Sequence, residues 1–492
     1  MSLSTADRPE TSPSSSAVPE TGLKRIADFF DDFAPVEARW RRRNRTYHRL
    51  IESLMRFYVP PGASVLEIGC GSGDLLAALQ PQRGVGIDVS PTMIQAAAEN
   101  HPTLDFVCAA GESFIRDEEF EFIVFSDLVP FADDLLAVLQ NAARMSTPRT
   151  RLVLHTYSQL WRPVIRLAEW LHLKPRKPIR NWFTPQDVRN LLALAGFEVV
   201  TFSRRVLFPK RIPFLTTFLN GVVGNIWPFT YLCLTYWIVA RPTPERLPED
   251  LSVSVVVPCR NEAGMVGEII ERIPEIGSET EIVFVEGGST DGTREEIERQ
   301  IALHPERRLS LFVQPGKGKA DAVRIGFEKA SGDVFMILDA DLTVAPEDLP
   351  KFYEALISGR AQLGNGSRLV YDLDPQAMRF LNVAGNKAFA VLFGFLIGQW
   401  VKDTLCGTKA LLRRDYEAIA ASRSYFGDFD PFGDFDLLLG AARLSLKITD
   451  LPVRYGARHY GTTNISRFQH GWLLLRMSTL AFKKLKVDPV RV

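Results

Sequence analysis

The chain has 492 residues, 46% of them hydrophobic and 24% charged, which predicts about two or three domains of an ordinary globular protein. Lys plus Arg and Asp plus Glu each total 58, so the formal net charge is zero, and no basic excess indicates a nucleic-acid partner. The five cysteines follow no disulfide or metal-ligand spacing, which favours reduced thiols in a cytoplasmic protein.

The N-terminal segment precedes the first periodic pattern. Residues 2–22 are rich in Ser, Thr, Pro and Glu and lack an apolar core, so we expect residues 1–25 to be disordered and not a signal peptide. Further along, no stretch reaches the roughly 18 uninterrupted apolar residues of a membrane-spanning helix. The two nearest, 213–240 and 379–401, are interrupted by Asn and by Pro or Lys, which favours buried or interfacial helices.

Strand and helix patterns then alternate in two blocks. In the first, we expect strands at 64–68, 84–88, 105–108, 121–126, 151–155 and 197–202, and helices at 36–58, 74–79, 91–99, 133–144 and 185–195. In the second, we expect strands at 253–257, 281–285, 309–313, 334–338 and 362–365, and helices at 263–273, 291–302, 318–329, 347–357 and 378–397. Alternation predicts parallel sheets with helices on both faces. Pro-rich residues 241–252 predict a linker between domains at 26–240 and 253–492.

A glycine motif follows the first strand. Residues 65–73 read Val-Leu-Glu-Ile-Gly-Cys-Gly-Ser-Gly, and glycines permit a tight turn and close approach of a ligand to the backbone. The next strand ends in Asp88, an acid suited to a ribose diol. Glu67 argues against a bound pyrophosphate because it adds negative charge. It suits a cationic ligand with an amino-acid moiety.

This block resembles the class I S-adenosylmethionine-dependent methyltransferases, over about residues 26–240. Further similar segments are Asp88-Val89-Ser90, the turn at 109–112 and Trp182-Phe183-Thr184-Pro185. The resemblance implies that S-adenosylmethionine is bound without metal by Glu67, Gly69, Gly71, Gly73, Asp88, Val89 and Glu112. Within this set, Glu67 and the first glycines would line the methionine end, Asp88 the ribose, and Val89 and Glu112 the adenine. The alternative is a glycine turn that binds nothing.

The methyl acceptor cannot be read from the motifs. The fourth strand ends in Phe125-Ser126-Asp127 and lacks the Asn-Pro-Pro-Tyr of nitrogen methylation. His155 ends the next strand, where it is a candidate general base or a structural residue. Five arginines between 39 and 45 predict either a solvated helix face or a site for an anionic acceptor or lipid headgroup.

Polar motifs follow four strands of the second block. They are Pro258-Cys259-Arg260-Asn261-Glu262, the loop at 286–292, the Lys-bearing loop at 316–322, and Asp339-Ala340-Asp341. Open α/β sheets bind ligands at the carboxyl ends of their strands. Two carboxylates there would hold a divalent cation against a diphosphate, lysines would meet phosphate, and acids and amides would contact base and ribose.

Together these motifs resemble the family-two glycosyltransferases of the GT-A fold, most of all the dolichol-phosphate mannose synthase and polyprenyl-phosphate branch, over roughly 253–470. The resemblance implies that a nucleotide sugar is bound by Pro258, Asn261, Glu262, Glu286, Lys319, Asp321, Asp339 and Arg368. It also implies Mg²⁺ or Mn²⁺ on Asp341, with Asp339 on metal or ribose. Glu286-Gly287-Gly288-Ser289 stands where many relatives have Asp-Asp-Gly-Ser, which leaves UDP and GDP both open.

A later acidic motif provides the candidate bases. Asp434 and Asp436 open an apolar helix, and a hydroxyl acceptor needs a carboxylate to take its proton. We favour Asp436, by its match to relatives, with Asp434 second; helix capping is the alternative for both. The segment Asp403–Gly407 resembles the family's acceptor side.

The C-terminal end suggests membrane contact. Helix 378–397 is nearly all apolar, and the last helix leads to Lys483, Lys484 and Lys486, a basic pattern that can lie in a lipid interface. Together with this pattern, the resemblance to polyprenyl-phosphate glycosyltransferases implies a lipid-phosphate acceptor and a peripheral protein on the cytoplasmic membrane face. Ordinary packing of the last helix is the alternative.

The two resemblances imply an α/β protein with two Rossmann-like domains in tandem and a bifunctional methyl- and glycosyltransferase. One alternative is a glycosyltransferase of a soluble glycan or protein with the first domain only a scaffold. A nucleotidyltransferase is less favoured, because such enzymes place a Gly-rich, Arg- or Lys-bearing loop after the first strand, where this chain has 258–262.

Overall fold

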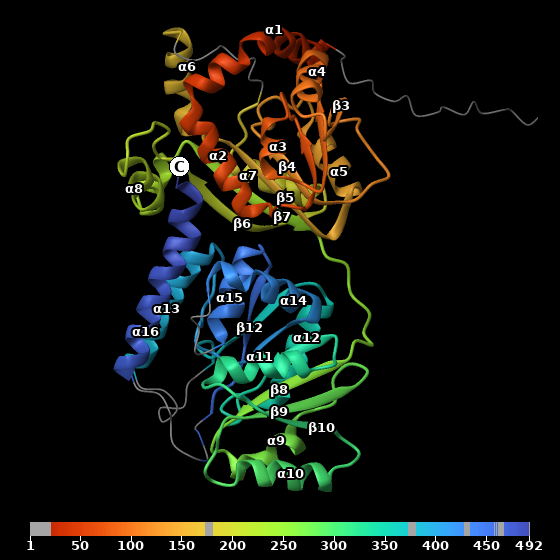
Figure 1. The fold of residues 1–492 in the computed structure, drawn as a ribbon, viewed down its shortest axis with the longest axis vertical. Helices are drawn as coiled ribbons and strands as arrows, with labels where there is room; N and C mark the ends of the chain where they lie inside the picture. Colours follow the sequence, from red (N-terminus) through yellow and green to blue (C-terminus); the bar gives the residue numbers. More distant parts are fainter. Residues whose placement is uncertain are drawn as a thin grey trace, which may run out of the picture.

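The computed structural model describes residues 21–172, 181–371, 380–427, 433–456, 458, 460 and 467–491. Two α/β domains are stacked along the long axis of the molecule (Figure 1). The expected disordered segment falls largely outside the described residues, but helix α1 (Thr21–Arg43) begins before residue 26. The expected helix at 36–58 is two helices, because α1 ends and α2 (Arg45–Tyr58) begins on either side of Asn44.

The first domain is built on a seven-stranded sheet of order β3-β2-β1-β4-β5-β7-β6. Its strands are β1 (Ser64–Ile68), β2 (Arg83–Asp88), β3 (Asp105–Cys108), β4 (Phe120–Ser126), β5 (Ser146–Tyr157), β6 (Phe197–Arg205) and β7 (Thr235–Pro242). Strands β1 to β5 are parallel, and β7 runs antiparallel between β5 and β6. The expected parallel arrangement is confirmed for β1 to β5, whereas the antiparallel β7 makes the whole sheet mixed.

Strand β7 corrects the interpretation of 213–240 as a buried or interfacial helix. Its residues Thr-Tyr-Trp-Ile-Val-Ala are buried, and β-branched and aromatic side chains suit a strand covered on both faces. The strand also runs two residues into the expected linker at 241–252. The helices of this domain besides α1 and α2 are α3 (Asp74–Leu79), α4 (Pro91–Asn100), α5 (Leu135–Arg144), α6 (Arg162–Trp170), α7 (Pro185–Leu194) and α8 (Leu215–Gly221).

The second domain has a seven-stranded sheet of order β10-β9-β8-β11-β13-β12-β14. Its strands are β8 (Val253–Cys259), β9 (Thr280–Glu286), β10 (Arg308–Val313), β11 (Val334–Ile337), β12 (Leu363–Ser367), β13 (Lys409–Leu412) and β14 (Ile448–Pro452). Strands β8 to β11 are parallel, whereas β13 runs antiparallel to β11 and β12. Two Rossmann-like α/β domains in tandem are thus confirmed.

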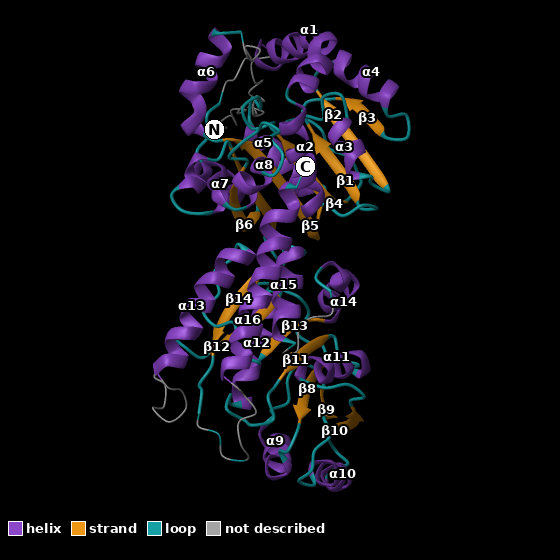
Figure 2. Cartoon of the chain, turned by 60° about the vertical axis from the view of Figure 1, so that its left-hand side comes forward, coloured by secondary structure: helices purple, strands orange, loops and turns teal. Residues whose placement is uncertain are grey.

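Helices cover both faces of this second sheet (Figure 2). They are α9 (Val266–Arg272), α10 (Thr293–Leu303), α11 (Lys319–Lys329), α12 (Leu349–Ile357), α13 (Phe380–Ile397), α14 (Arg413–Ser422), α15 (Asp434–Arg443) and α16 (Arg467–Phe482), followed by the short turns η7 (Lys483–Val487) and η8 (Asp488–Val490). In the described part of the chain, none of the helices combines the length and hydropathy needed to span a bilayer.

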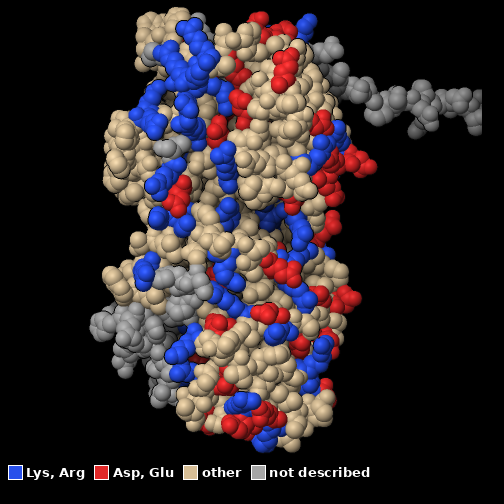
Figure 3. Space-filling view, in the orientation of Figure 1, with Lys and Arg blue, Asp and Glu red and all other residues tan. Residues whose placement is uncertain are grey.

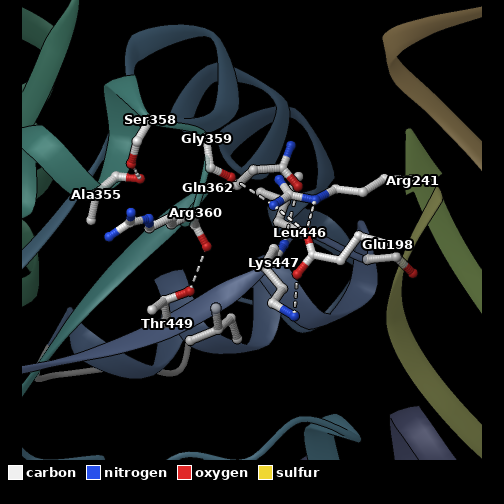
Figure 4. Close-up of polar contacts among 12 residues, drawn as sticks. Glu198, Arg241, Ala355, Ser358, Gly359, Arg360, Gln362, Leu446, Lys447 and Thr449 are labelled. Carbon is white, nitrogen blue, oxygen red and sulfur yellow. Dashed lines mark hydrogen bonds and ion pairs between the residues drawn. The ribbon is translucent and has the colours of Figure 1, made fainter. Parts of the chain in front are cut away.

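The two domains share an extensive interface. Figure 4 shows Arg241 of β7 donating hydrogen bonds to Glu198 of β6 and to the carbonyl oxygen of Gly359, and Lys447 pairing with Glu198. Arg151 of β5 donates to the carbonyl oxygen of Ser445 at 3.0 Å. The contacts of Arg241 with Gly359 and of Arg151 with Ser445 are buried, and together with the Lys447–Glu198 pair they join the two domains.

The last residues of the chain pack within the first domain. Val490 is fully buried in a cluster with Leu50, Leu54 and Trp237. Lys486, one of the three lysines expected at a lipid interface, is buried, and burial lowers its pKa well below the usual range. Lys484 lies 3.7 Å from Asp488, and Lys483 is exposed. This stretch is therefore packed, which contradicts the expectation of an interfacial tail.

Candidate active sites

A cavity of about 190 Å³ opens at the carboxyl ends of the first-domain strands. Residues expected to bind cofactor come to it from separate segments. Those lining it are Glu67, Gly69, Gly71, Asp88, Val89 and Glu112, together with the candidate base His155. The structure therefore brings most of the sequence-predicted set into one enclosed space.

Glu67 is the most unusual group in this cavity. It lies in β1 with 1% of its surface exposed, and its Oε2 has no hydrogen-bond partner among the described residues. Burial raises the pKa of this carboxyl to about 8, although Arg41 opposes the shift. An unpaired buried carboxylate is costly unless a cation meets it. The residue therefore fits a ligand that brings a positive charge.

The glycine turn positions the second acid. Gly69 and Gly71 have φ values of +79° and +51°, which favour glycine. The amide of Gly71 donates to Asp88 Oδ2 at 2.9 Å, and the amide of Ser90 donates to Oδ1 at 3.0 Å. These bonds orient the Asp88 carboxylate at the cavity, where it could accept hydrogen bonds from a diol.

Gly73 packs against β3 at the start of α3. It is not among the cavity-lining residues, and an added Cβ would lie 2.6 Å from the ring of Phe106. Its φ of +73° starts α3. A side chain here would press on the Phe106 ring, so the contacts seen for Gly73 are those of the turn.

Glu112 supports the opposite wall. Its Oε1 accepts hydrogen bonds from the amides of Asp133 and Asp134 at 2.8 and 3.3 Å. The amide of the Asn141 side chain donates to the Glu112 carbonyl oxygen at 2.7 Å. The residue thus fixes the loop before α5 while lining the cavity.

Helix α1 covers the cavity, a feature the sequence interpretation missed. The side chains that line it recur every three or four residues along one helix face, as expected for a helix packed on a surface. They are Leu23, Ile26, Phe30, Phe33 and Glu37. Asp31 Oδ1 accepts hydrogen bonds from the Ser90 hydroxyl at 2.5 Å and from the Thr92 amide at 3.1 Å, which ties α1 to the start of α4. The apolar period at 23–33 was the available signal.

A buried polar cluster lies beside the glycine turn. His155 Nε2 is 2.8 Å from the Ser126 hydroxyl, and its ring stacks on Trp237 with centroids 4.6 Å apart. His155 Nδ1 is 3.7 Å from Asp127 Oδ1, and the Tyr47 hydroxyl donates to Asp127 Oδ2 at 3.3 Å. Burial lowers the pKa of His155, so the imidazole is neutral at physiological pH. Sequence reasoning missed Tyr47 and Asp127 as neighbours of this base.

In the second domain, Asp339 follows β11 and meets Lys319 at the start of α11. Lys319 Nζ lies 2.5 Å from Asp339 Oδ1. A Cβ on Gly407 would fall 2.2 Å from both Asp339 Oδ2 and Lys319 Nζ. Only glycine therefore lets the 403–408 loop approach this pair, which brings the expected acceptor-side segment against the expected metal and phosphate ligands.

Asp341 keeps part of its carboxylate available. Its Oδ1 accepts from the amide and the hydroxyl of Thr343 at 3.1 and 2.8 Å. Within the described ranges, no donor is hydrogen-bonded to its Oδ2, and no group of three or more His, Cys, Asp or Glu side chains could form a metal cage. Mg²⁺ is commonly held by one or two carboxylates plus substrate phosphates, so these oxygen donors fit that kind of ion.

Glu262 lies close to Asp341. Its amide donates to the Thr293 hydroxyl at 2.9 Å, and its carboxylate pairs with Arg458. Burial raises the pKa of Glu262 to about 7; Arg458 opposes this shift, while the negative charges of Asp341 and Asp291 add to it. Its neighbour Asn261 has a φ of +59° and accepts from the Thr290 amide at 2.8 Å. Both residues therefore shape the loop after β8.

Two other expected donor-binding acids are engaged with their own loops. Glu286 Oε1 accepts from the Ser289 amide at 2.5 Å, and Asp321 Oδ2 accepts from the Gly316 amide at 3.0 Å. Pro258 lies within β8 opposite Val285 of β9. These residues sit at the expected edge of the sheet, where their visible contacts hold loop shape.

Arg368 pairs with a buried acid. Its Nε lies 2.7 Å from Asp403 Oδ2, and its guanidinium stacks over Tyr455 at 5.0 Å. Asp403 is fully buried and also accepts from Asn386 at 2.9 Å. The pKa of Asp403 is lowered by Arg368 against the effect of burial. A phosphate contact by Arg368 therefore requires sharing this guanidinium with Asp403.

Asp436 is also held by cations. Its Oδ2 accepts from Arg423 Nε at 2.8 Å and lies 3.5 Å from Arg324 Nη2. Asp434 opens α15, but its side chain lies outside the described residues. Asp436 thus joins α15 to α11 and to the turn that follows α14.

Comparison with known families separates the two halves. Residues 39–201 match the family model described as a methyltransferase domain, and residues 254–419 match glycosyl transferase family 2. The chain joins a methyltransferase domain to a family 2 glycosyltransferase domain. The methyltransferase domain contains the cavity with Glu67, and the glycosyltransferase domain contains the Asp339–Asp341 edge.

Three curated relatives match the glycosyltransferase half. Glycosyltransferase AglJ of Haloferax volcanii is 29% identical over 47% of this chain and 71% of its own length. Dolichol-phosphate mannosyltransferase of Pyrococcus furiosus is 30% identical over 44% of this chain and 59% of its own length. The undecaprenyl-phosphate 4-deoxy-4-formamido-L-arabinose transferase of Pectobacterium carotovorum is 35% identical over 44% of this chain and 63% of its own length. The chain thus spans less than two thirds of the last two relatives.

Proposed function

We propose that the protein is a bifunctional transferase. Its methyltransferase half moves a methyl group from S-adenosylmethionine, and its glycosyltransferase half moves a sugar from a UDP- or GDP-linked donor, with inversion, to a polyprenyl phosphate or related lipid phosphate. The observation that carries the first activity is the unpartnered Oε2 of buried Glu67. The second rests on the Asp339–Asp341 edge in a family 2 domain.

Each of the cavity residues would bind a different part of the cofactor. Glu67 would receive the ammonium group, Asp88 the ribose hydroxyls, and Val89 and Glu112 the adenine. Bound there, S-adenosylmethionine supplies an electrophilic methyl group. Helix α1 covers part of the cavity, and neutral His155 would accept a proton from a hydroxyl acceptor.

The glycosyltransferase edge suits a nucleoside diphosphate. Asp341, with Asp339, would hold Mg²⁺ or Mn²⁺, and that ion supplies charge stabilisation for the departing diphosphate. Lys319 beside Asp339 is placed to contact the same phosphates. The Gly407 loop closes over this pair on the acceptor side.

A lipid-phosphate acceptor is supported by two observations. A phosphate oxygen is ionised at neutral pH and needs no base, which agrees with Asp436 being held by Arg423 and close to Arg324. Two of the relatives carry names of dolichol-phosphate and undecaprenyl-phosphate transferases. A hydroxyl acceptor would need Asp436 released from these arginines.

The test uses the full chain, a panel of radiolabelled UDP- and GDP-sugars, Mg²⁺ or Mn²⁺, and polyprenyl phosphate in detergent. We expect label in organic-extractable lipid with one nucleotide class, and none after EDTA. Label found exclusively in water-soluble acceptors would overturn the lipid acceptor, and EDTA-insensitive transfer would overturn the metal assignment. Calorimetry with S-adenosylmethionine tests the first domain separately.

A further inference from the structure

Helix α6 of the methyltransferase domain presents its apolar side to solvent. Leu160, Val164, Leu167, Trp170 and Leu171 are between 49% and 65% exposed, whereas Ile165 is buried. Their spacing of three or four residues places them on one face. A surface helix normally turns such a face toward the core, so this one has no partner within the described chain.

A second exposed apolar group surrounds α8. Phe214 is 93% exposed and Trp227 is 77% exposed, and further exposed side chains are Ile212, Phe218, Ile226, Phe229, Tyr231 and Leu232. The segment that presents them is well ordered by polar contacts. The Asn220 side chain bonds to the amide and carbonyl of Phe208 at 2.8 and 2.9 Å, and the Thr216 hydroxyl donates to the Lys210 carbonyl at 2.6 Å. Exposed apolar patches of this kind mark interaction sites.

The charge around these side chains is basic. No acidic residue occurs between Glu198 and Glu245, a stretch that contains Lys210 and Arg211 beside Phe214, and both of these cations are exposed. Figure 3 shows Lys and Arg side chains gathered at the upper left, where Figure 1 places α6 and the end of α1. Exposed aromatic side chains bordered by cations suit an anionic lipid surface.

The same side of the molecule continues into the glycosyltransferase domain. Figure 1 places α6, α8, α13 and α16 along its left side, and Figure 2, in which that side is turned forward, shows α8 and α16 near the middle of the view. On α13 and α16, Val391 and Trp472 are 62% and 72% exposed. Helix α8 packs on η7, where a Cβ added to Gly221 would lie 3.1 Å from Val487 Cα. Because α8 packs on η7, the exposed side chains around α8 and those on α13 and α16 belong to one packed surface.

We propose that this side, with α6 and residues 210–232 as its main contact, docks the protein on the surface of an anionic lipid bilayer. The docking surface thus lies mostly on the methyltransferase domain and not on the lysine tail. The docking proposal rests on the proposed function, because a lipid-phosphate acceptor would require the protein to work at a membrane.

Vesicle flotation of the full chain tests the docking surface. We expect the protein to float with vesicles of phosphatidylcholine and phosphatidylglycerol, and to float less with phosphatidylcholine alone or in high salt. The double variant Phe214→Ser/Trp227→Ser should lower vesicle affinity by about tenfold or more, because both aromatic rings lose burial in the interface. Lys210→Glu/Arg211→Glu should remove the preference for phosphatidylglycerol.

The matched control is Leu303→Ser, which removes a side chain 56% exposed on α10 at the other end of the molecule (Figure 1). This variant should float like the unmodified protein, and all variants should keep S-adenosylmethionine affinity if they fold.

Unmodified protein that does not float, or an aromatic double variant that floats equally well, would overturn the proposal. So would a change confined to oligomeric state, which would assign the surface to a second copy of the chain. Flotation needs no sugar transfer, so a protein that floats but glycosylates only soluble acceptors would refute the lipid acceptor alone.

Discussion

The two active sites balance their charges in opposite ways. In the methyltransferase cavity, Glu67 is buried with an oxygen that has no partner. At the glycosyltransferase edge, Asp339 is paired with Lys319 and Glu262 with Arg458. A site for a cationic ligand can be built in advance as a buried carboxyl group that ionises when the cation binds. A site for an anionic donor and its metal holds acids and bases that satisfy one another until the ligand separates them.

The largest effect should come from a substitution at the glycosyltransferase edge, where the acids must exchange their present hydrogen-bond and ion-pair partners for the metal and the donor. Asp341→Asn keeps the shape of the side chain but removes the charge on which a hard cation depends, so we expect sugar transfer to fall by about two orders of magnitude or more. The measurement is radiolabelled transfer at saturating Mg²⁺ or Mn²⁺. S-adenosylmethionine affinity of the same variant is the internal control and should not change. Near-normal transfer would mean that Asp341 is not the metal ligand.

Glu67→Gln tests the charge balance in the methyltransferase cavity. The amide cannot balance a bound ammonium group, and loss of one partner of a buried charge pair costs about 2–3 kcal/mol, or roughly 30- to 140-fold in Kd. Calorimetry with S-adenosylmethionine measures this loss. Glu37→Gln, which changes a less buried acid lining the same cavity, is the control and should have a smaller effect. Equal affinity in the Glu67 variant would refute the proposed cationic contact.

The raised pKa of Glu67 makes cofactor binding pH-dependent. Below its folded-state pKa of about 8 the unliganded carboxyl is mostly protonated, and it must lose that proton to receive an ammonium group. Affinity should therefore rise with pH between about 6 and 8, by up to about tenfold per pH unit, and should fall again above that range, where the α-ammonium group of the ligand loses its proton. Calorimetry in buffers of different ionisation enthalpy would detect the released proton. Glu67→Gln should lack both the slope and the proton release, and a flat profile in the unmodified protein would contradict the assignment.

Sequence patterns predicted the parts of the molecule that depend on local spacing. The strands before Glu67 and Asp339, the glycine turn and the acid at Asp88 follow from alternation and from residues placed at strand ends. The cover formed by α1 was missed, since its apolar period at 23–33 adjoins a Ser- and Pro-rich segment. The pairing of Arg368 with Asp403 joins residues 35 positions apart in sequence, and spacing alone cannot assign such a partner.

Strand β7 and the C-terminal turns illustrate a second limit. A short apolar run such as 235–242 fits a buried helix or a buried strand equally well until its neighbours are known. Likewise, the basic run at 483–486 resembles an interfacial segment, yet Lys486 is buried and Val490 lies in the methyltransferase core. The tertiary partner decides both cases.

The smallest expected effect concerns how much the C-terminal turn around Val490 stabilises the methyltransferase domain. Val490→Ala removes two methyl groups from a fully buried position, which should lower the free energy of unfolding by about 1–2.5 kcal/mol. Thermal unfolding of the methyltransferase domain, followed by loss of S-adenosylmethionine binding, is the measurement. Val391→Ala, at a position 62% exposed on α13, is the control and should change little. A fragment ending near residue 248 lacks Val490 altogether, so it should unfold at a lower temperature than the full chain. If that fragment is as stable as the intact protein, the C-terminal turn merely rests on a methyltransferase domain that is complete without it.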